Sequence, residues 1–516
     1  MKLSALIEAV NPLETIFRNG AATTDPEIRR ICYRSDRADD LSVFVAVRGG
    51  TSDGHEYAGD AVRRGAVAVV AERPVDVGAA VILVSDTRRA MAIMADALYG
   101  SPSSRLKLIG ITGTNGKTTT ACLLEHILKD GGFRPGVIGT IDSHFGETVI
   151  QGSLTTPEAP DLQERLARMA DAGVDHVVLE VSSHGVVQDR IFGCRFDMGI
   201  FTNLSRDHLD FHGTMDAYRK AKTDFFTGYM GDSSTMIINC DADEGKRLAA
   251  ALTRGTVMTV GTDSPGDPAV NAPAFDVRGE KASFDHSGIS GRIRFPSGKI
   301  DFHSPLVGRF NLENILCAAG AAFALGVDPE TIGSALATFA VVPGRLEKVA
   351  NRSGRQVFVD YSHTPEALEN VLVSLRPIVA GRLICIFGCG GDRDNGKRPL
   401  MGKIAATLAD LAIVTSDNPR TEPPERIISE ILEGVRQTKA VEMAAERLGS
   451  HFEKGAYTVV PDRSNAIDTG VRVSLAGDAI LIAGKGHETY QILGRHTIDF
   501  DDRVQAQKAL ARHGMA

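Results

Sequence analysis

Residues 113–119 read Gly-Thr-Asn-Gly-Lys-Thr-Thr, a combination suited to holding the phosphates of a nucleotide. The glycines let successive backbone N–H groups point at phosphate oxygens, and a following helix adds its positive N-terminus. We expect Lys117 to reach the terminal phosphates and the Thr118 hydroxyl to bind Mg²⁺. The strict phosphate-loop pattern has a glycine five positions before Gly116, where this chain has Ile111, so the loop is a variant.

The alternative interpretation is an ordinary glycine-rich turn between a strand and a helix. Residues 106–112 are typical of a strand, and residues 117–129 show a helical pattern that ends at Gly131 and Gly132. Strand, loop and helix therefore follow one another as a phosphate loop requires. We interpret the segment as an ATP-binding loop whose contacts come from Gly113, Thr114, Asn115, Gly116, Lys117, Thr118 and Thr119.

Two further segments place polar side chains just after expected strands. Glu180 lies at the end of a strand expected over 175–181, where an acidic partner for the magnesium ion of a phosphate loop is usual. His208, within Asp-His-Leu-Asp at 207–210, follows a strand expected over 196–202. Taken alone, His208 fits a surface loop. Lys222, in Tyr-Arg-Lys-Ala-Lys at 218–222, fits a solvated helix.

The C-terminal third contains residues suited to an amino acid. Arg393 ends the glycine-rich turn 387–394, and Asp-Asn-Pro-Arg occupies 417–420 after another expected strand. An arginine fork binds a carboxylate through two parallel hydrogen bonds, which a lysine cannot reproduce. A neighbouring acid and amide can hold an ammonium group. Together these residues suit the zwitterionic end of an amino acid.

The bulk properties limit the class of protein. The chain has 516 residues, 43% of them hydrophobic and 24% charged, with a net charge of -8. Such a surface repels phosphate backbones, so we expect no nucleic-acid partner. Seven scattered cysteines are typical of a reducing compartment. No apolar run approaches a membrane span and no signal peptide is recognised, so we expect a cytoplasmic protein without a membrane partner.

Alternating strands and helices predict an α/β protein of three domains. The first is a small α/β domain over 1–104, with residues 102–104 as the linker. The second, over 105–345, is a phosphate-loop domain with a mainly parallel sheet and a small antiparallel appendage at 255–305. The third, over 346–516, is a Rossmann-like doubly wound domain with five expected strands.

The variant loop Ile111–Thr119 resembles that of the Mur ligases, a family that includes the folylpolyglutamate synthases. The resemblance extends over the whole chain. These enzymes use ATP to join a carboxylate to an amine through an acyl phosphate. The resemblance implies that Glu180 and His208 hold a second Mg²⁺ beside the one at Thr118. It also implies that CO₂ converts Lys222 into a carbamate, which supports the metal ions. The implied catalytic residues are Lys117, Lys222 and His208.

The resemblance also assigns the other end of the nucleotide. Gly308–Asn314 is similar to the family's adenine-side helix start, with Asn314 as the direct contact. Arg345, in the hinge to the C-terminal domain, is implied as a charge clamp on ATP. Asp360, at a strand end, suits contacts to the ribose or to the phosphate-binding lysine. Helix caps or salt bridges are the simpler alternatives for each of these residues.

Within the family, Asp-Asn-Pro-Arg is the form of members that add meso-diaminopimelate, whereas lysine-adding members replace the arginine. The implied diaminopimelate contacts are Arg393, Asp417, Asn418, Pro419, Arg420, Gly484 and Glu488. The implied carboxylate substrate is UDP-N-acetylmuramoyl-L-alanyl-D-glutamate, contacted by Ser35, Thr155, Thr156, Ser182, Gln188 and Arg190. Ser35 lies in Arg-Ser-Asp-Arg, where the family more often has Asp-Ser-Arg.

The resulting prediction is a monomeric amide ligase of peptidoglycan precursor synthesis. The D-glutamyl carboxylate attacks the γ-phosphoryl group of ATP, and the acyl phosphate then meets the amine. The residues do not identify the base that deprotonates the amine, for which His363 is a candidate. Three alternatives remain: a ligase for another amine such as lysine, a phosphate-transferring kinase or NTPase, and a nucleotide-gated scaffold.

Overall fold

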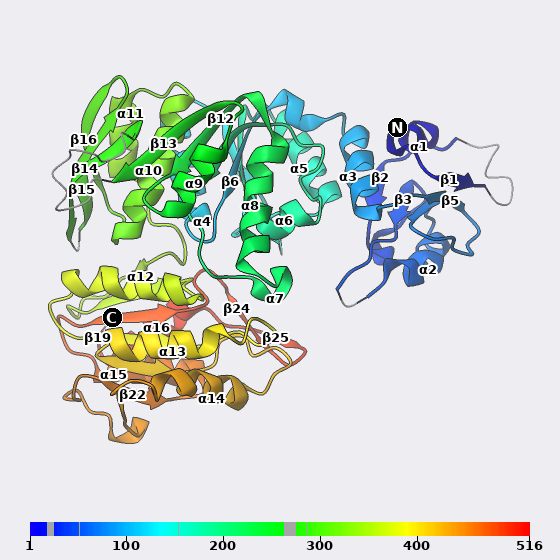
Figure 1. Ribbon diagram of the computed structural model, residues 1–516. Helices are drawn as coiled ribbons and strands as arrows, with labels where there is room; N and C mark the ends of the chain where they lie inside the picture. Colours follow the sequence, from blue (N-terminus) through cyan, green and yellow to red (C-terminus); the bar gives the residue numbers. More distant parts are fainter. Residues whose placement is uncertain (18–24, 51, 153, 263–274, 286, 516) are drawn as a thin grey trace.

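The computed structural model describes residues 1–17, 25–50, 52–152, 154–262, 275–285 and 287–515. Three α/β units follow one another along the chain (Figure 1). The N-terminal unit lies to one side of the central unit, next to α5 (Ala159–Asp171), and the C-terminal unit lies beneath the central one. No helix in the described part of the chain is long and apolar enough to cross a membrane.

The N-terminal unit is built on a sheet with the strand order β1-β5-β4-β3-β2. All neighbouring strands are parallel except β1 and β5. The strands are β1 (Glu14–Ile16), β2 (Arg30–Cys32), β3 (Ser42–Val45), β4 (Ala68–Ala71) and β5 (Ala80–Leu83). The helices are α1 (Leu3–Val10), α2 (Ala58–Arg63) and α3 (Thr87–Leu98). The expected linker forms the short helical turn η4 (Pro102–Arg105).

The central sheet has the order β16-β15-β14-β13-β12-β11-β6-β10-β7-β8-β9. From β14 to β7 the neighbouring strands are parallel, so their carboxyl ends meet along one edge. The parallel strands are β6 (Lys107–Thr112), β7 (Pro135–Ile138), β10 (His176–Glu180), β11 (Phe196–Phe201), β12 (Met230–Asn239), β13 (Thr256–Thr262) and β14 (Val277–Asp285). At the two ends the strands run antiparallel: β8 (Ser143–Phe145), β9 (Thr148–Ile150), β15 (Gly288–Phe295) and β16 (Gly298–Ser304).

The expected antiparallel appendage is therefore continuous with the central sheet. Strand β14 pairs in parallel with β13 and antiparallel with β15, so it joins the two kinds of pairing within one sheet. A surface helix, α9 (Asp243–Ala251), connects β12 to β13. Residues 263–274, which fall within the segment expected to form the appendage, lie outside the described residues.

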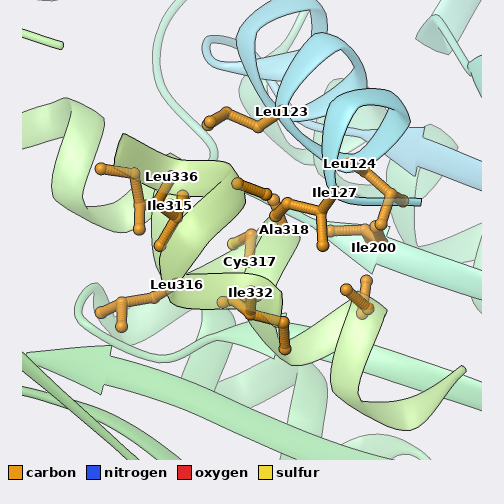
Figure 2. Close-up of a cluster of buried hydrophobic side chains, with 14 of the residues drawn as sticks. Leu123, Leu124, Ile127, Ile200, Ile315, Leu316, Cys317, Ala318, Ile332 and Leu336 are labelled. Atoms are coloured by element: carbon orange, nitrogen blue, oxygen red, sulfur yellow. The ribbon is translucent and has the colours of Figure 1, made fainter. Parts of the chain in front are cut away.

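Helix α4 (Lys117–Asp130), which follows the phosphate loop, is held by apolar packing. Its Leu123, Leu124 and Ile127 pack into a buried cluster with α10 (Arg309–Ala324) and α11 (Pro329–Thr338) (Figure 2). Each fully buried aliphatic side chain stabilises the folded state by roughly 1.5–3 kcal/mol relative to exposure. This packing fixes the position of the helix N-terminus, and thereby of the loop before it.

The C-terminal unit is a doubly wound sheet with the order β17-β18-β23-β19-β20-β22-β21, parallel except at β17. Its strands are β17 (Glu347–Val349), β18 (Gln356–Asp360), β19 (Leu383–Phe387), β20 (Leu411–Val414), β21 (Val441–Glu442), β22 (Ala456–Val459) and β23 (Ala479–Ala483). Its helices are α12 (Pro365–Leu375), α13 (Lys397–Leu408), α14 (Pro424–Val435), α15 (Arg463–Val473) and α16 (Asp502–Arg512). The five strands expected from the sequence are confirmed, and a hairpin of β24 (Tyr490–Leu493) and β25 (His496–Asp499) is added.

Candidate active site

The phosphate loop connects β6, near the middle of the parallel sheet, to α4. The Lys117 ammonium donates to the carbonyl oxygens of Gly113 at 2.8 Å and Thr114 at 2.9 Å. At Gly116 the backbone φ is 86°, and an added Cβ would lie 2.2 Å from Oδ1 of Asn314. Only glycine fits there, so the loop packs directly on the predicted adenine-side asparagine of α10.

The loop is braced by the segment after β11. The Asn115 N–H donates to Oδ1 of Asn203 at 2.9 Å, and the Thr202 hydroxyl donates to the Asn115 carbonyl at 2.6 Å. The Thr114 hydroxyl lies 3.1 Å from the phenol oxygen of Tyr218 on α8 (Met215–Tyr229). Thr119, inside α4, is buried. The predicted loop residues thus lie together, and two neighbouring segments fix their backbone.

Glu180 faces this loop from the carboxyl end of β10, beside β6. Its carboxylate accepts hydrogen bonds from the hydroxyls of Thr118 at 3.1 Å and Thr140 at 2.9 Å, and from the Thr140 N–H at 3.0 Å. Only 1% of Glu180 is exposed. Among the described residues no cation forms an ion pair with it, so this buried charge is suited to a metal ion. Sequence reasoning missed Thr140, whose only signal is its place after β7.

His208 and Lys222 both lie near enough to the loop lysine, Lys117, for its charge to act on them. His208 precedes the short helix α7 (Leu209–His212) with φ 53°, and its Nε2 lies 3.3 Å from Oδ2 of Asp207. Burial lowers the pKa of His208 to about 3, so the imidazole is neutral. Sequence reasoning did not single out His184, whose ring lies 4.9 Å from that of His208.

Lys222 is buried on α8, with only 2% of the residue exposed. Its ammonium lies 4.6 Å from the centre of the Tyr218 ring, and no hydrogen bond or ion pair joins it to any residue in the described ranges. Burial, followed by the positive charge of Lys117, holds the pKa of Lys222 well below its ordinary value. The side chain is therefore a buried amine that loses its proton readily.

These residues do not form a closed metal cage. No group of three or more His, Cys, Asp and Glu side chains in the described ranges is arranged to hold a metal ion. Glu180 and Thr118 offer oxygen ligands, and His208 offers a nitrogen. Mg²⁺ commonly completes its shell with waters and substrate phosphates, so a partial set fits that ion.

The hinge between the second and third domains contacts the metal side of the loop. Nη2 of Arg345 donates to the Thr118 hydroxyl at 3.1 Å, and the guanidinium lies 4.6 Å above the Tyr361 ring. Nε of Arg345 is buried without a hydrogen-bond partner among the described residues. Asp360 accepts backbone N–H bonds from Leu346 at 2.7 Å and Ser362 at 2.8 Å, so here it pins the hinge. Its contact to the ribose or the lysine stays a prediction.

The residues predicted for the carboxylate substrate form one connected cluster. The Thr156 hydroxyl donates to the Glu180 carbonyl at 2.8 Å and accepts from the Ser182 N–H at 2.9 Å. Arg190 donates to the Thr156 carbonyl at 3.0 Å and to Oε1 of Gln188 at 2.6 Å. A further contact of 3.0 Å joins the hydroxyls of Thr155 and Thr140. Because the Thr140 hydroxyl donates to the Glu180 carboxylate, the cluster is linked to that carboxylate through Thr140.

Ser35 lies apart from this cluster, in a cavity of about 350 Å³ between the first two domains. Arg88 and Glu158 line the same cavity, and Glu158 also pairs with Arg190 at 3.1 Å. The Tyr33 hydroxyl donates to Asp161 at 2.7 Å across the boundary. The cavity thus leads from Ser35 towards the predicted substrate cluster.

The loops predicted to bind the amino acid meet at the carboxyl ends of β19, β20 and β23. Nη1 of Arg420 donates to the Gly391 carbonyl at 2.9 Å, and an added Cβ at Gly390 would lie 2.9 Å from that same Nη1 and 3.9 Å from Cγ of Arg393. Both arginines therefore flank Gly390. Pro419 is buried between Asn418 and Arg420.

The acid and amide of this region lie beside the last sheet strand. The Asn418 amide donates to Oε2 of Glu488 at 2.8 Å, and an added Cβ at Gly484 would lie 2.4 Å from Oδ2 of Asp417. Sequence reasoning gave no role to Lys485, which is fully buried and donates to Glu488 at 3.1 Å. Burial, with the charge of Asp417, raises the pKa of Glu488.

His363 lies in the loop after β18. Its Nδ1 is 2.8 Å from the Tyr361 carbonyl oxygen and therefore carries the hydrogen, which leaves the lone pair on Nε2. Burial lowers the pKa of His363 to about 4, so it is neutral at neutral pH. It remains a candidate base.

The site combines a phosphate loop at the carboxyl edge of a parallel sheet with two arginines presented by the C-terminal domain. This combination defines a nucleotide-dependent enzyme acting on anionic substrates. Family models match the chain in three places: the Mur ligase family catalytic domain at residues 27–99, the Mur ligase middle domain at 111–322, and the Mur ligase glutamate ligase domain at 344–486. The chain belongs to the Mur ligase family and is an ATP-dependent ligase.

Individual relatives cover the whole chain. It is 44% identical to UDP-N-acetylmuramoyl-L-alanyl-D-glutamate–2,6-diaminopimelate ligase of Geobacter metallireducens, over 99% of this chain and 98% of that one. A solved structure of a ligase with that name is 29% identical, with a TM-score of 0.63, and covers 98% of this chain and 100% of its own. Mycobacterium tuberculosis folylpolyglutamate synthase, complexed with ADP and AMPPCP, shares the fold at 19% identity and a TM-score of 0.61, over 77% of this chain and 92% of its own.

A charged clamp positions the turn that holds Glu180. His144 on β8 lies 2.6 Å from Oδ1 of Asp142 through Nδ1 and 2.9 Å from Oε1 of Glu125 on α4 through Nε2. These two carboxylates raise the pKa of His144 to about 9. The backbone carbonyl of Asp142 accepts the Gly139 N–H at 2.9 Å, so the residue held by His144 also closes the turn that carries Thr140.

Replacing Lys117 with Ala should lower the rate of ATP turnover by about 100-fold or more, because the loop loses its charge on the transferred phosphoryl group. The measurement is phosphate release from ATP with all substrates present. Lys107→Ala is the control, since Lys107 pairs with Asp197 at the opposite end of β6. If Lys117→Ala kept most of the rate, the assignment of the loop would be wrong.

Replacing His144 with Gln should reduce the loss of folding stability that occurs as the pH becomes alkaline. Because the pKa of His144 is raised in the folded state, the protonated histidine stabilises the fold. This stabilisation is complete below pH 6.5 and is lost as the pH rises through about 9. The free energy of unfolding in urea should therefore differ between wild type and His144→Gln at about pH 6 and converge near pH 10. The exposed His451→Gln is the control. An equal difference at both pH values would contradict the clamp.

Proposed function

We propose that the chain adds meso-diaminopimelate to the D-glutamate of UDP-N-acetylmuramoyl-L-alanyl-D-glutamate, using ATP, in the synthesis of peptidoglycan precursors in the cytoplasm. The supporting observation is the pairing of two sites: the phosphate loop faced by Glu180, and the loops of Arg393 and Arg420 on the closing domain. Full-length relatives at 41–44% identity carry the name of this ligase. The chain is proposed to act as a monomer.

In the first step the D-glutamyl carboxylate attacks the γ-phosphorus of ATP, and the bond between that phosphorus and the β,γ-bridging oxygen breaks, releasing ADP. Lys117 stabilises charge on the transferred group, and Arg345 adds a second positive charge beside Thr118. Thr155, Thr156 and Arg190 orient the carboxylate substrate, because their cluster adjoins Glu180.

Bound magnesium would neutralise phosphate charge at this site. Thr118 and Glu180 would hold one ion, and Glu180 with His208 would hold a second. A CO₂-derived carbamate on Lys222 would add an anion near the loop lysine, Lys117. The buried Lys222 amine, with no hydrogen bond to any residue in the described segments, suits that reaction because an unprotonated amine is the nucleophile for CO₂.

In the second step the diaminopimelate amine attacks the acyl carbon, and phosphate leaves as the carbon–oxygen bond breaks. Arg393 and Arg420 would bind a carboxylate of the amino acid, and Asp417 with Glu488 would hold its ammonium end. His363 would accept the amine proton at Nε2. Closure of the C-terminal domain excludes water, which would otherwise hydrolyse the acyl phosphate.

The test of this proposal is phosphate release from ATP with the UDP-linked dipeptide and a panel of amines. We expect release only when both the dipeptide and meso-diaminopimelate are present, with L-lysine a poor substitute. Preference for lysine would identify a ligase for another amine. Release without any amine acceptor would point to a phosphate-transferring enzyme instead.

Replacing Arg420 with Ala should raise the KM for meso-diaminopimelate by about 10- to 100-fold, because a charge-assisted hydrogen bond contributes about 1.5–3 kcal/mol. Arg420→Lys should recover little of this, since lysine lacks the two-pronged geometry. The KM for ATP should stay unchanged in steady-state assays. The exposed Arg436→Ala is the matched control. An unchanged KM for the amine would remove Arg420 from the site.

Replacing Lys222 with Ala should lower kcat by about 100-fold or more, because the metals lose an anionic support. Lys220→Ala on the same helix is the control, because Lys220 is exposed and pairs with Asp224. Carbon-13 NMR in labelled bicarbonate should show a carbamate signal in wild type and Lys220→Ala but not in Lys222→Ala. A fully active Lys222→Ala would contradict the carbamate.

A further inference from the structure

Lys397 is a buried lysine to which neither the sequence analysis nor the proposed mechanism gives a role. It is the first residue of α13, and only 7% of it is exposed. No hydrogen bond or ion pair joins its ammonium to any residue in the part of the chain that the structure describes. Burying a lysine without an anionic partner is costly, so such a residue points to an anion that binds there.

The adjacent Arg398 shows the contrast. It is also fully buried, but its guanidinium donates to Glu422 at 2.8 Å and to Glu430 at 2.7 Å. These contacts hold the start of α13 to the loop before α14 and to α14 itself, so the charge of Arg398 is already paired within the fold. The charge on Lys397 is additional to what the fold needs.

The start of α13 lies against the central domain. An added Cβ at Gly396 would lie 3.0 Å from Nη2 of Arg206, which follows β11. Nε of Arg206 also lies 3.8 Å from Oδ2 of Asp394. The loop that carries Arg393 therefore touches the loop that carries His208, and Lys397 begins the helix at this contact.

The neighbours of Lys397 belong to the phosphate side of the site. Lys397 is close enough to Asp207 and His363 for its charge to interact with both. Asp207 interacts in the same way with Lys117. The Asp207 carboxylate is therefore near both the loop lysine of one domain and the helix lysine of the other. The N-terminus of α13, with its own partial positive charge, adds to the positive potential.

We propose that Lys397 is a further catalytic residue that binds the transferred phosphoryl group when the C-terminal domain closes. This inference rests on the proposed ligase function. The ammonium contacts a phosphoryl oxygen while the carboxylate oxygen–phosphorus bond forms and the bond to ADP breaks, and it transfers no proton. Lys117 and Lys397 then hold the group from opposite domains. The acyl phosphate is stabilised only after closure, which protects it from water.

The test uses the full-length enzyme with Mg²⁺, ADP, aluminium fluoride and the UDP-linked dipeptide, without an amine. This mixture mimics the transferred phosphoryl group and traps ADP. Lys397→Met should bind ADP as wild type does but fail to trap it, and its kcat for ligation should fall by about 100-fold or more. Lys397→Arg should recover part of the trapping. Lys403→Met, an exposed position on the same helix, should behave as wild type.

Two results would overturn the inference. Normal trapping and kcat in Lys397→Met would show that the lysine does not touch the phosphoryl group. Normal trapping with a raised KM for diaminopimelate would show that it binds the amino-acid carboxylate. If thermal melting shows that Lys397→Met is unfolded, ADP trapping, kcat and the KM for diaminopimelate are measured in Lys397→Arg instead. Should wild type trap ADP but form no amide with diaminopimelate, the proposed amine is wrong while the role of Lys397 still stands.

Discussion

The buried carboxylate of Glu180 is the constraint on which the rest of the site depends. It is held by the hydroxyls of Thr118 and Thr140 and by a backbone N–H, all of them neutral donors. A buried anion held this way favours a cation nearby, and the nearest protein charges are directed elsewhere: Lys117 over its own loop, Arg345 towards Thr118. A nucleotide with its metal would satisfy all three groups at once. The site is therefore preorganised for a triphosphate rather than for substrate alone.

The same carboxylate explains the arrangement of the domains around it. The cluster predicted to bind the dipeptide is linked to it through Thr155 and Thr140, and the hinge is linked to it through Arg345 and Thr118. Asp360 fixes the segment that joins the central and C-terminal domains by accepting two backbone N–H groups. Placing the predicted carboxylate and amine sites on separate domains suits a reaction whose intermediate must not meet water.

The sequence predicts the parts of this arrangement that are local. The phosphate loop is recognisable because strand, glycine-rich turn and helix are adjacent, and Glu180 because it ends an apolar run. Local sequence gives no signal for three other residues, Thr140, His144 and Lys397. Their contacts involve residues distant along the chain, and the sequence around each of them is typical of a loop, strand or helix. The extension of the central sheet through β13 and β14 is missed for the same reason, since pairing between strands is not encoded in either strand alone. Family resemblance supplies the assignments of Lys222 and the Asp-Asn-Pro-Arg loop, which spacing alone leaves open.

In the proposed reaction the dipeptide carboxylate attacks phosphorus at the Lys117 loop before any amide forms. The most direct measurement is to label that carboxylate with oxygen-18 and follow the label during ligation. One labelled oxygen should appear in the released phosphate for each amide bond made, because the carboxylate oxygen leaves with the phosphoryl group. Phosphate free of label, with amide formed at the normal rate, would contradict it.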